Sequence, residues 1–258
     1  MQRRYQMNFL DRIVQQKKQE LTDINTKATR INVPTVSFLE RLKQKKLHLI
    51  AEVKQASPSK GIIYDTFNPV QIAKQFEQHG ASCVSVLTDK EFFKGSINDL
   101  MAVKQAIQLP VLRKDFIIDP SQVQETYSMG ADVMLLILDI LSISQTNELI
   151  DAASGYGIEC LLEVHSMSAV EKLSGIPQKP LVGINNRNLE TFKCDINQTR
   201  DLLPIIKSIA PNGCVVAESG YSTPNELDAL AELQINAVLI GEGLKKNNRL
   251  LEWFHCES

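Results

Sequence analysis

Ionisable side chains gather at the ends of short apolar runs in this chain, where they could act together as acids and bases. Glu52 and Lys54 close LHLIAEVK, Lys114 closes PVLRK, and Glu163 and Glu218 end CLLEV and CVVAE. Paired amines and carboxylates suit general acid–base chemistry, in which one group donates a proton and another accepts one. Solvation explains any single charge at a strand end equally well, but a mixed cluster is costly to bury without a chemical role.

Side-chain alternation predicts where these charges point. Residues two apart on a strand share a face. Glu52 and Lys54 therefore point to one side while Val53 points to the other, and Glu163 and His165 follow the same rule. We expect the charged faces to line one cavity.

Two short turns rich in small residues are candidates for phosphate binding. They are ESG at 218–220 and GEG at 241–243, and each connects an apolar run to a helical segment. Backbone N–H groups in such turns can bind phosphate. A single glycine-rich turn is more often only a tight connection, but the two together favour a phosphate site.

Large apolar side chains just beyond several runs could form a wall for an aromatic ring. We expect one of Phe92 and Phe93 to pack in the core instead. The candidates are Phe92, Phe93, Phe116, Leu135 and Phe192.

Eight short apolar runs must position these side chains. Each is apolar without alternation, as expected for a parallel strand covered on both faces. The segments between them carry helix signals, including a capping residue before proline at 68–69, 119–120 and 223–224. The runs are 47–53, 83–87, 110–114, 133–138, 160–164, 181–185, 214–218 and 237–241.

Eight strand–helix units predict an α/β fold, a (β/α)8 TIM barrel, whose active sites lie where the C-terminal strand ends meet. An open doubly wound sheet is the alternative, because strand count alone does not prove closure, although no G-x-G-x-x-G follows the first strand. Helical spacing in 1–46, with Phe9, Leu10 and Ile13 on one face, predicts an N-terminal helical extension. We expect one domain over 1–258, with the barrel at 47–258.

Composition and charge exclude several classes of protein. The 28 Lys and Arg residues nearly balance 30 Asp and Glu residues, which argues against a nucleic-acid binder. No apolar run approaches the roughly 20 residues that cross a bilayer, and the N-terminal segment lacks the apolar core of a signal peptide. The 5 cysteines form no C-x-x-C pair, so no zinc cluster or disulfide framework is predicted. We expect a cytoplasmic protein that binds neither nucleic acid nor membrane.

Seven blocks, in order along the chain, resemble the indole-3-glycerol-phosphate synthases of tryptophan biosynthesis. The resemblance extends from about residue 8 to the end of the chain, and EVK–SPSKG, RKDF and INNRNL are its most specific parts. The blocks are LIAEVKQASPSKG (49–61), VLRKDFIIDP (111–120), GADVMLLI (130–137), LLEVHS (161–166), VGINNRNLETF (182–192), VVAESGY (215–221) and VLIGEGL (238–244).

The resemblance implies a carboxy-lyase that closes the indole ring of 1-(2-carboxyphenylamino)-1-deoxyribulose 5-phosphate and releases carbon dioxide and water. That substrate carries a phosphate, an aromatic carboxylate and a ketone, which correspond to the three kinds of residue described above. The family uses no metal or organic cofactor, so the implied ligand is a small phosphosugar alone. No partner domain follows the barrel in this sequence, so we expect a monofunctional monomer.

Roles for the charged residues also follow from the resemblance. Lys114 matches the general acid that protonates the ketone, and Lys54 matches a lysine near the substrate carboxylate that can share acid work in the dehydration. Glu163 matches a carboxylate that acts as a base or stabilises positive charge on the ring nitrogen. Glu52 and Asn185 match groups that orient the others. Which lysine acts in which step is left open.

Further positions match substrate contacts of the family. Glu242 stands where many relatives have serine in the phosphate turn, which adds a negative charge, and Tyr221 replaces a common isoleucine. Around the phosphate and ribulose chain the matches are Ser57, Glu218, Ser219, Gly220 and Gly241, with Arg187 beside the substrate, and the apolar wall comprises Phe93, Phe116, Leu135, Leu189 and Phe192.

Two other functions fit parts of this pattern. A related phosphosugar barrel such as phosphoribosylanthranilate isomerase would share the phosphate turns, but it needs an Asp/Cys acid–base pair rather than Lys54 and Lys114. A barrel that only binds a ligand or scaffolds a complex has no need to keep both lysines together with Glu163.

Overall fold

Eight parallel strands close into a barrel in the computed structural model, which describes residues 8–25, 29–44, 46–58, 61–189, 191–247 and 249–256. The strand order is β1-β10-β9-β8-β7-β6-β5-β4, and β1 pairs with both β10 and β4. This closure confirms the predicted barrel over the open sheet. The strands are β1 (His48–Val53), β4 (Cys83–Leu87), β5 (Val111–Lys114), β6 (Val133–Ile137), β7 (Glu159–Val164), β8 (Leu181–Asn185), β9 (Cys214–Glu218) and β10 (Ala237–Ile240).

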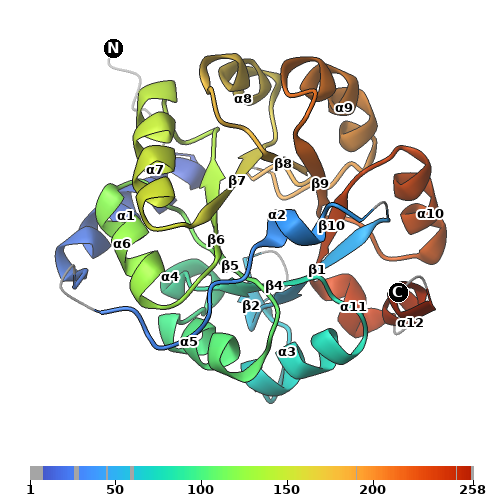
Figure 1. The fold of residues 1–258 in the computed structure, drawn as a ribbon, viewed down its shortest axis with the longest axis horizontal. Coiled ribbons are helices and arrows are strands. Elements are labelled where there is room, and N and C mark those ends of the chain that lie inside the picture. The colour runs from blue at the N-terminus through green and yellow to red at the C-terminus, as the bar shows by residue number, and fades with distance from the viewer. Residues whose placement is uncertain are drawn as a thin grey trace, which may run out of the picture.

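Helices surround the barrel on its outside (Figure 1). Asn68 and Asp119 cap α3 and α6 by accepting backbone N–H groups of the first turn, and Thr223 forms a capping box at α10, as the sequence predicts. No helix among the described residues is long and apolar enough to span a membrane. The longer helices are α3 (Pro69–Gln78), α5 (Ile97–Ala106), α6 (Pro120–Ser128), α7 (Ile143–Gly155), α8 (Met167–Lys172), α9 (Asn197–Ile209), α10 (Pro224–Glu232) and α12 (Arg249–Cys256).

Alternation along the strands separates two apolar cores. Leu49 and Val53 of β1 pack toward the helices, whereas Ile50 belongs to the cluster inside the barrel. Glu52 therefore points inward, one layer above Ile50, as the alternation predicts. The same pattern in β5, β7 and β9 places the charged residues above an apolar interior layer.

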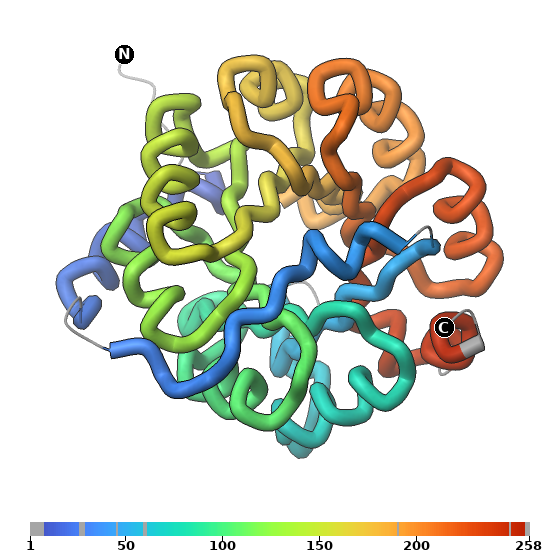
Figure 2. The backbone as a smooth tube through the Cα atoms, in the orientation of Figure 1, coloured from blue at the N-terminus to red at the C-terminus, as the bar shows by residue number. Residues whose placement is uncertain are grey.

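The segment before β1 follows the outside of the barrel from one end to the other (Figure 2). Helix α1 (Phe9–Glu20) lies at the C-terminal ends of the strands, where Ile13 is fully buried in the interior cluster. After the short 3-10 helix η1 (Leu21–Asp23) the chain passes along α6, and the Ile31 N–H donates to the Ser128 carbonyl at 3.0 Å.

Helix α2 (Phe38–Arg41) covers the N-terminal end of the barrel, at the centre of the ring in Figure 1. Ser37 caps this helix, and Phe38 is buried in the interior cluster. The backbone N–H of Phe38 donates to Glu159, the first residue of β7, at 3.0 Å. The predicted extension therefore carries two helices that contact opposite ends of the barrel.

Five short elements escape the sequence prediction. They are η1, the hairpin strands β2 (Ala56–Ser57) and β3 (Gly61–Ile62), the single turn α4 (Lys90–Phe93) and the 3-10 helix η2 (Leu173–Gly175). Elements this short leave no periodic pattern in the sequence. Helix α11 (Glu242–Lys246) follows β10 and begins inside the predicted GEG turn.

Candidate active site

A cavity of about 330 Å³ opens at the C-terminal ends of the strands. It brings together residues from every predicted component of the site, although they come from distant parts of the chain. The predicted residues that line it are Glu52, Lys54, Ser57, Phe93, Lys114, Phe116, Leu135, Glu163, Asn185, Arg187, Leu189, Phe192, Ser219, Gly220 and Gly241. Glu218 lies below the cavity and is completely buried.

Lys114 is the centre of the charged cluster. Its Nζ lies 3.0 Å from Glu163 Oε2 and 3.2 Å from Glu218 Oε2. Asn185 Nδ2 donates to the other Glu163 oxygen at 3.1 Å, which holds that carboxylate in place. Lys54 pairs with Glu52 at the end of β1, which β4 separates from β5.

The cluster determines the charge on each of its members. Burial alone would lower the pKa of Lys114, but the carboxylates of Glu163, Glu218 and Glu52 raise it above its ordinary value. Burial alone would raise the pKa of Glu163, but the Lys114 ammonium beside it holds that pKa at about 2. Lys114 and Glu163 are therefore charged at neutral pH.

The pKa values of the other two carboxyl groups, those of Glu218 and Glu52, shift in opposite directions. Burial and the negative charge of Glu163 raise the pKa of Glu218 well above its ordinary value. Burial opposes ionisation of Glu52, but the ammonium groups of Lys54 and Lys114 lower its pKa. Two lysines thus face three carboxyl groups.

Two glycines make space for these carboxyl groups. A Cβ atom on Gly183 of β8 would overlap Glu218 Oε1, and one on Gly241 would lie 2.5 Å from Glu52 Oε1. Both close approaches involve flexible side chains rather than backbone. Gly183 is absent from the predicted site, because its importance is visible only when β8 and β9 are side by side.

The two small-residue turns lie at one end of the cavity. Ser219 and Gly220 have left-handed backbone conformations, with φ of 66° and 96°. The second turn contributes Gly241 and Glu242, and Lys246 of α11 lines the same end without having been predicted. Glu242 Oε2 lies 3.6 Å from Lys246 Nζ, so a cation accompanies the unusual acid of this turn.

Tyr221 is buried beside the first turn. Its hydroxyl accepts from Asn186 Nδ2 and donates to Thr199 Oγ1, both at 3.0 Å. The phenol thus connects the turn after β9 to the end of β8 and to α9.

Aromatic side chains form the opposite end of the cavity. The rings of Phe93 and Phe116 are 6.1 Å apart. Phe9 of α1 also lines the cavity, and its ring lies 4.9 Å from that of Phe192 and 5.5 Å from that of Phe92. Phe93 lines the cavity and Phe92 packs against the extension, as expected for one of the two. Sequence reasoning places Phe9 on a helix face but not in the site.

His165 points away from this cluster, into a second cavity of about 780 Å³ beneath α1. Its Nε2 lies 3.4 Å from Asp139 Oδ2 and 4.0 Å from Glu163 Oε1. His165 therefore borders the charged cluster from behind rather than lining the main cavity. Among the described residues, no group of three or more His, Cys, Asp or Glu side chains is placed to hold a metal ion.

Comparison with known proteins identifies relatives of this chain. A family model described as indole-3-glycerol phosphate synthase matches residues 4–253. Proteins of that name are similar over most of their length. The one from Shouchella clausii is 41% identical over 93% of each chain. That from Microcystis aeruginosa is 43% identical over 93% of this chain and 85% of its own, and that from Acinetobacter baylyi is 39% identical over 95% and 93%.

A solved structure supports the fold independently. The 3-hexulose-6-phosphate synthase from Salmonella typhimurium superposes with a TM-score of 0.60 and 14% identity, over 82% of this chain and 99% of its own. At that identity the likeness concerns the barrel alone.

Proposed function

The chain belongs to the indole-3-glycerol phosphate synthase family, and on that premise we propose that it closes the indole ring of 1-(2-carboxyphenylamino)-1-deoxyribulose 5-phosphate in tryptophan biosynthesis. The observation that carries this proposal is the position of Lys114, an ammonium group that lines the cavity between two small-residue turns and an aromatic wall. The ketone of the substrate lies between its phosphate and its aromatic ring, so the acid sits where the reacting carbon would be.

The reaction needs groups that donate and accept protons, and the charged side chains of the cavity can supply them. The ring carbon that bears the carboxylate bonds to the ketone carbon, the ketone oxygen takes one proton, and loss of carbon dioxide restores the aromatic ring. The hydroxyl then leaves as water with a second proton, while the CH₂ beside nitrogen gives one up. Two protons are donated and one is accepted, so the site needs acids and a base together.

Lys114 suits the first donation, because the carboxylates around it keep it protonated and it can stabilise the developing oxyanion. Glu163, ionised and held by Asn185, suits the acceptance of the CH₂ proton. Lys54, with Glu52 beside it, is placed to bind the substrate carboxylate and to donate the second proton.

The two ends of the cavity orient the substrate. We assign the phosphate to the backbone of the turns at Ser219 and Gly241, with Ser57 and Lys246 at the same end. We assign the aromatic ring to the wall of Phe93 and Phe116, and to the flanking residues Arg187, Leu189 and Phe192. Tyr221 and Glu218 support the site from behind.

Formation of indole-3-glycerol phosphate from the deoxyribulose substrate tests the reaction itself. Purified protein should produce indole absorbance in the presence of a metal chelator, at the rate seen without one. An absence of indole product would contradict the proposed function. A rate that falls with chelator and returns with added divalent cation would contradict the metal-free chemistry.

The role of Lys114 has a separate test. Lys114→Ala should lower kcat by about 10²- to 10⁴-fold, the range for loss of a general acid, with a small effect on substrate affinity. Circular dichroism at the assay temperature must show a folded variant, because the change leaves Glu163 without its cation. A kcat near the wild-type value would refute the assignment.

Two further properties belong to this proposal. The phosphorylated substrate and product are charged, so they cross membranes poorly and stay inside the cell. This property supports a cytoplasmic location. We propose that the protein acts as a monomer, since one chain supplies every residue of the site. Light scattering of the purified protein should give the mass of a single 28.9 kDa chain.

A further inference from the structure

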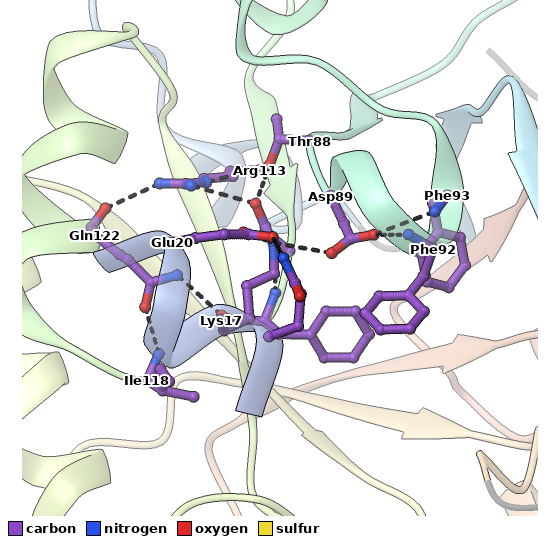
Figure 3. Close-up of polar contacts among 12 residues, drawn as sticks. Lys17, Glu20, Thr88, Asp89, Phe92, Phe93, Arg113, Ile118 and Gln122 are labelled. Atoms are coloured by element: carbon purple, nitrogen blue, oxygen red, sulfur yellow. Dashed lines mark hydrogen bonds and ion pairs between the residues drawn. The ribbon is translucent and has the colours of Figure 1, made fainter. Parts of the chain in front are cut away.

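A buried lysine in α1 connects the N-terminal extension to the site. Lys17 is 3% exposed, and its Nζ lies 2.8 Å from Asp89 Oδ2, 2.8 Å from Asp115 Oδ1 and 2.9 Å from Glu20 Oε2. Figure 3 shows Lys17 and Glu20 of α1 pointing toward Asp89 at the start of α4. None of these residues lines the phosphate end of the cavity.

Asp89 holds the aromatic wall. Its Oδ1 accepts the backbone N–H groups of Phe92 and Phe93, at 2.7 and 3.1 Å, and thereby caps α4. Its other oxygen faces Lys17, which is the only cation within ion-pair distance of Asp89 in the described part of the chain. The position of Phe93 in the cavity therefore depends on a carboxylate that α1 neutralises.

Asp115 holds the strand end that carries Lys114. Its Oδ1 accepts the Phe116 N–H at 2.8 Å, and its Oδ2 accepts from Thr88 Oγ1 at 2.5 Å. Arg113 Nη2 lies 3.2 Å from the same carboxylate but also pairs with Glu125. Lys17 supplies the second cation, so both residues that flank the Asp115 backbone, Lys114 and Phe116, are held in part by α1.

The same helix face carries a second contact with the wall. Phe9, Ile13 and Lys17 are spaced four residues apart and lie on one face of α1. Phe9 packs on Phe92, so α1 contacts α4 through an aromatic pair near its start and an ion pair near its end. Loss of the ion pair would leave Asp89 without a cation and Asp115 with Arg113 alone, and it would release the end of this contact.

We propose that Lys17 is a positioning residue for the ring-closing reaction, which fixes the aromatic wall and the Lys114 strand end relative to α1 through Asp89 and Asp115. The proposal rests on the proposed function and adds a residue from the extension to the machinery of the site. It concerns the aromatic end of the substrate and leaves the phosphate end unaffected.

Burial and charge support this reading. Burial alone would lower the pKa of Lys17, but the carboxylates of Asp115 and Asp89 raise it above its ordinary value, so the ammonium stays charged. Burial would raise the pKa of Asp115, but Arg113 and Lys17 hold it at about 2. Burial raises the pKa of Asp89 even though the Lys17 ammonium group lowers it. Ionisation of Asp89 therefore depends more strongly on Lys17 than ionisation of Asp115 does.

The test compares Lys17→Met with Lys18→Met in the full chain. Lys18 is the next residue on the same helix, is exposed, and makes no ion pair within the described residues, so it is a matched control for the loss of one ammonium group. At a temperature where circular dichroism shows both variants folded, Lys17→Met should lower kcat/KM at least about tenfold, the scale of a small misplacement of catalytic groups. Lys18→Met should remain within about twofold of wild type.

Ligand binding locates the effect within the cavity. Anthranilate, a fluorescent probe for the aromatic end, should bind Lys17→Met at least about fivefold more weakly, whereas inorganic phosphate should bind within about twofold of wild type. Equal weakening of both ligands, or of neither, would contradict the proposal. This binding experiment does not require turnover, so it still tests Lys17 if the wild-type protein forms no indole and the proposed function fails.

A double variant separates positioning from stability. Asp89→Asn removes the unpaired carboxylate, so Lys17→Met/Asp89→Asn should recover thermal stability relative to Lys17→Met and should fold even if the single variant does not. The proposal requires its kcat/KM and anthranilate affinity to stay low, because the ion pair that fixes the end of α1 to the start of α4 is still missing. Recovery of activity together with stability would show that Lys17 is only structural.

Discussion

At the scale of single residues, the charge state of Lys114 depends on two carboxyl groups whose pKa values shift in opposite directions. The Lys114 ammonium group holds the pKa of Glu163 at about 2, whereas burial and the negative charge of Glu163 raise the pKa of Glu218. Both carboxyl groups lie within ion-pair distance of Lys114 Nζ and raise the pKa of the lysine. The cluster therefore keeps Lys114 protonated before the reaction begins.

Glu242 adds a negative charge to the end of the cavity that we assign to the phosphate. Its side chain lines the cavity near the turn backbone, 3.6 Å from Lys246. A carboxylate there repels a substrate phosphate, and the exposed Lys246 offsets the repulsion only in part because it is well solvated.

Glu242→Ser should therefore lower KM about fivefold, equivalent to about 1 kcal/mol of removed repulsion, with kcat unchanged. The difference from wild type should shrink as salt is added, since screening weakens interactions between exposed charges. Steady-state kinetics at two ionic strengths measure both effects, and Glu242→Gln is the control that removes charge while keeping size. A higher KM in Glu242→Gln would show that the Glu242–Lys246 pair helps to bind phosphate.

At the scale of elements, strand β8 is shaped for the carboxyl group of its neighbour β9. Asn185 of β8 is in register with Glu218, and Gly183, two residues earlier on the same face, leaves space for the Glu218 carboxyl. The absence of one side chain on β8 thus determines how Glu218 approaches Lys114.

Gly183→Ala should lower kcat at least about tenfold, because the added methyl group displaces Glu218 and with it Lys114. The backbone of Gly183 lies in an ordinary strand conformation and its nearest neighbour is a flexible side-chain end, so unfolding by urea should show a loss of only about 1 kcal/mol. Kinetics and urea titration of the same preparation test both values. Unchanged turnover in the folded variant would exclude this coupling.

At the scale of the whole molecule, one buried ion pair joins the extension to the barrel and another lies inside the barrel, and both link stability to acid. Asp115 pairs with Lys17 of α1, and Glu163 pairs with Lys114 inside the barrel. Both carboxyl groups have a pKa of about 2 in the folded protein, below the value near 4 of an unfolded chain. They therefore stabilise the fold above about pH 4 and lose that contribution as pH falls toward 2.

The free energy of unfolding should decline between about pH 4 and pH 2, with each carboxyl group contributing at most about 1.4 kcal/mol per pH unit. Urea titrations across this interval measure the slope. Glu163→Gln and Asp115→Asn should each flatten it, whatever their stability at neutral pH. A slope that neither variant changes would mean that other groups control acid unfolding.

Much of the site is encoded locally and could be read from the sequence. Apolar runs and capping residues specify the strands and helices, and parallel strands with right-handed crossovers bring their C-terminal ends together. Residues at those ends, such as Glu52, Lys114 and Glu163, therefore meet in one cavity without further information. The family resemblance supplied their chemistry.

Tertiary structure alone decided the contacts that link distant segments. Lys17 and Phe9 are unremarkable residues on an amphipathic helix until α1 lies against α4, and Gly183 is only a small residue until β9 packs beside it. The raised pKa of Glu218 likewise depends on burial next to Glu163. A sequence specifies side chains and local conformation, but desolvation and charge pairing depend on neighbours that only the closed barrel brings together.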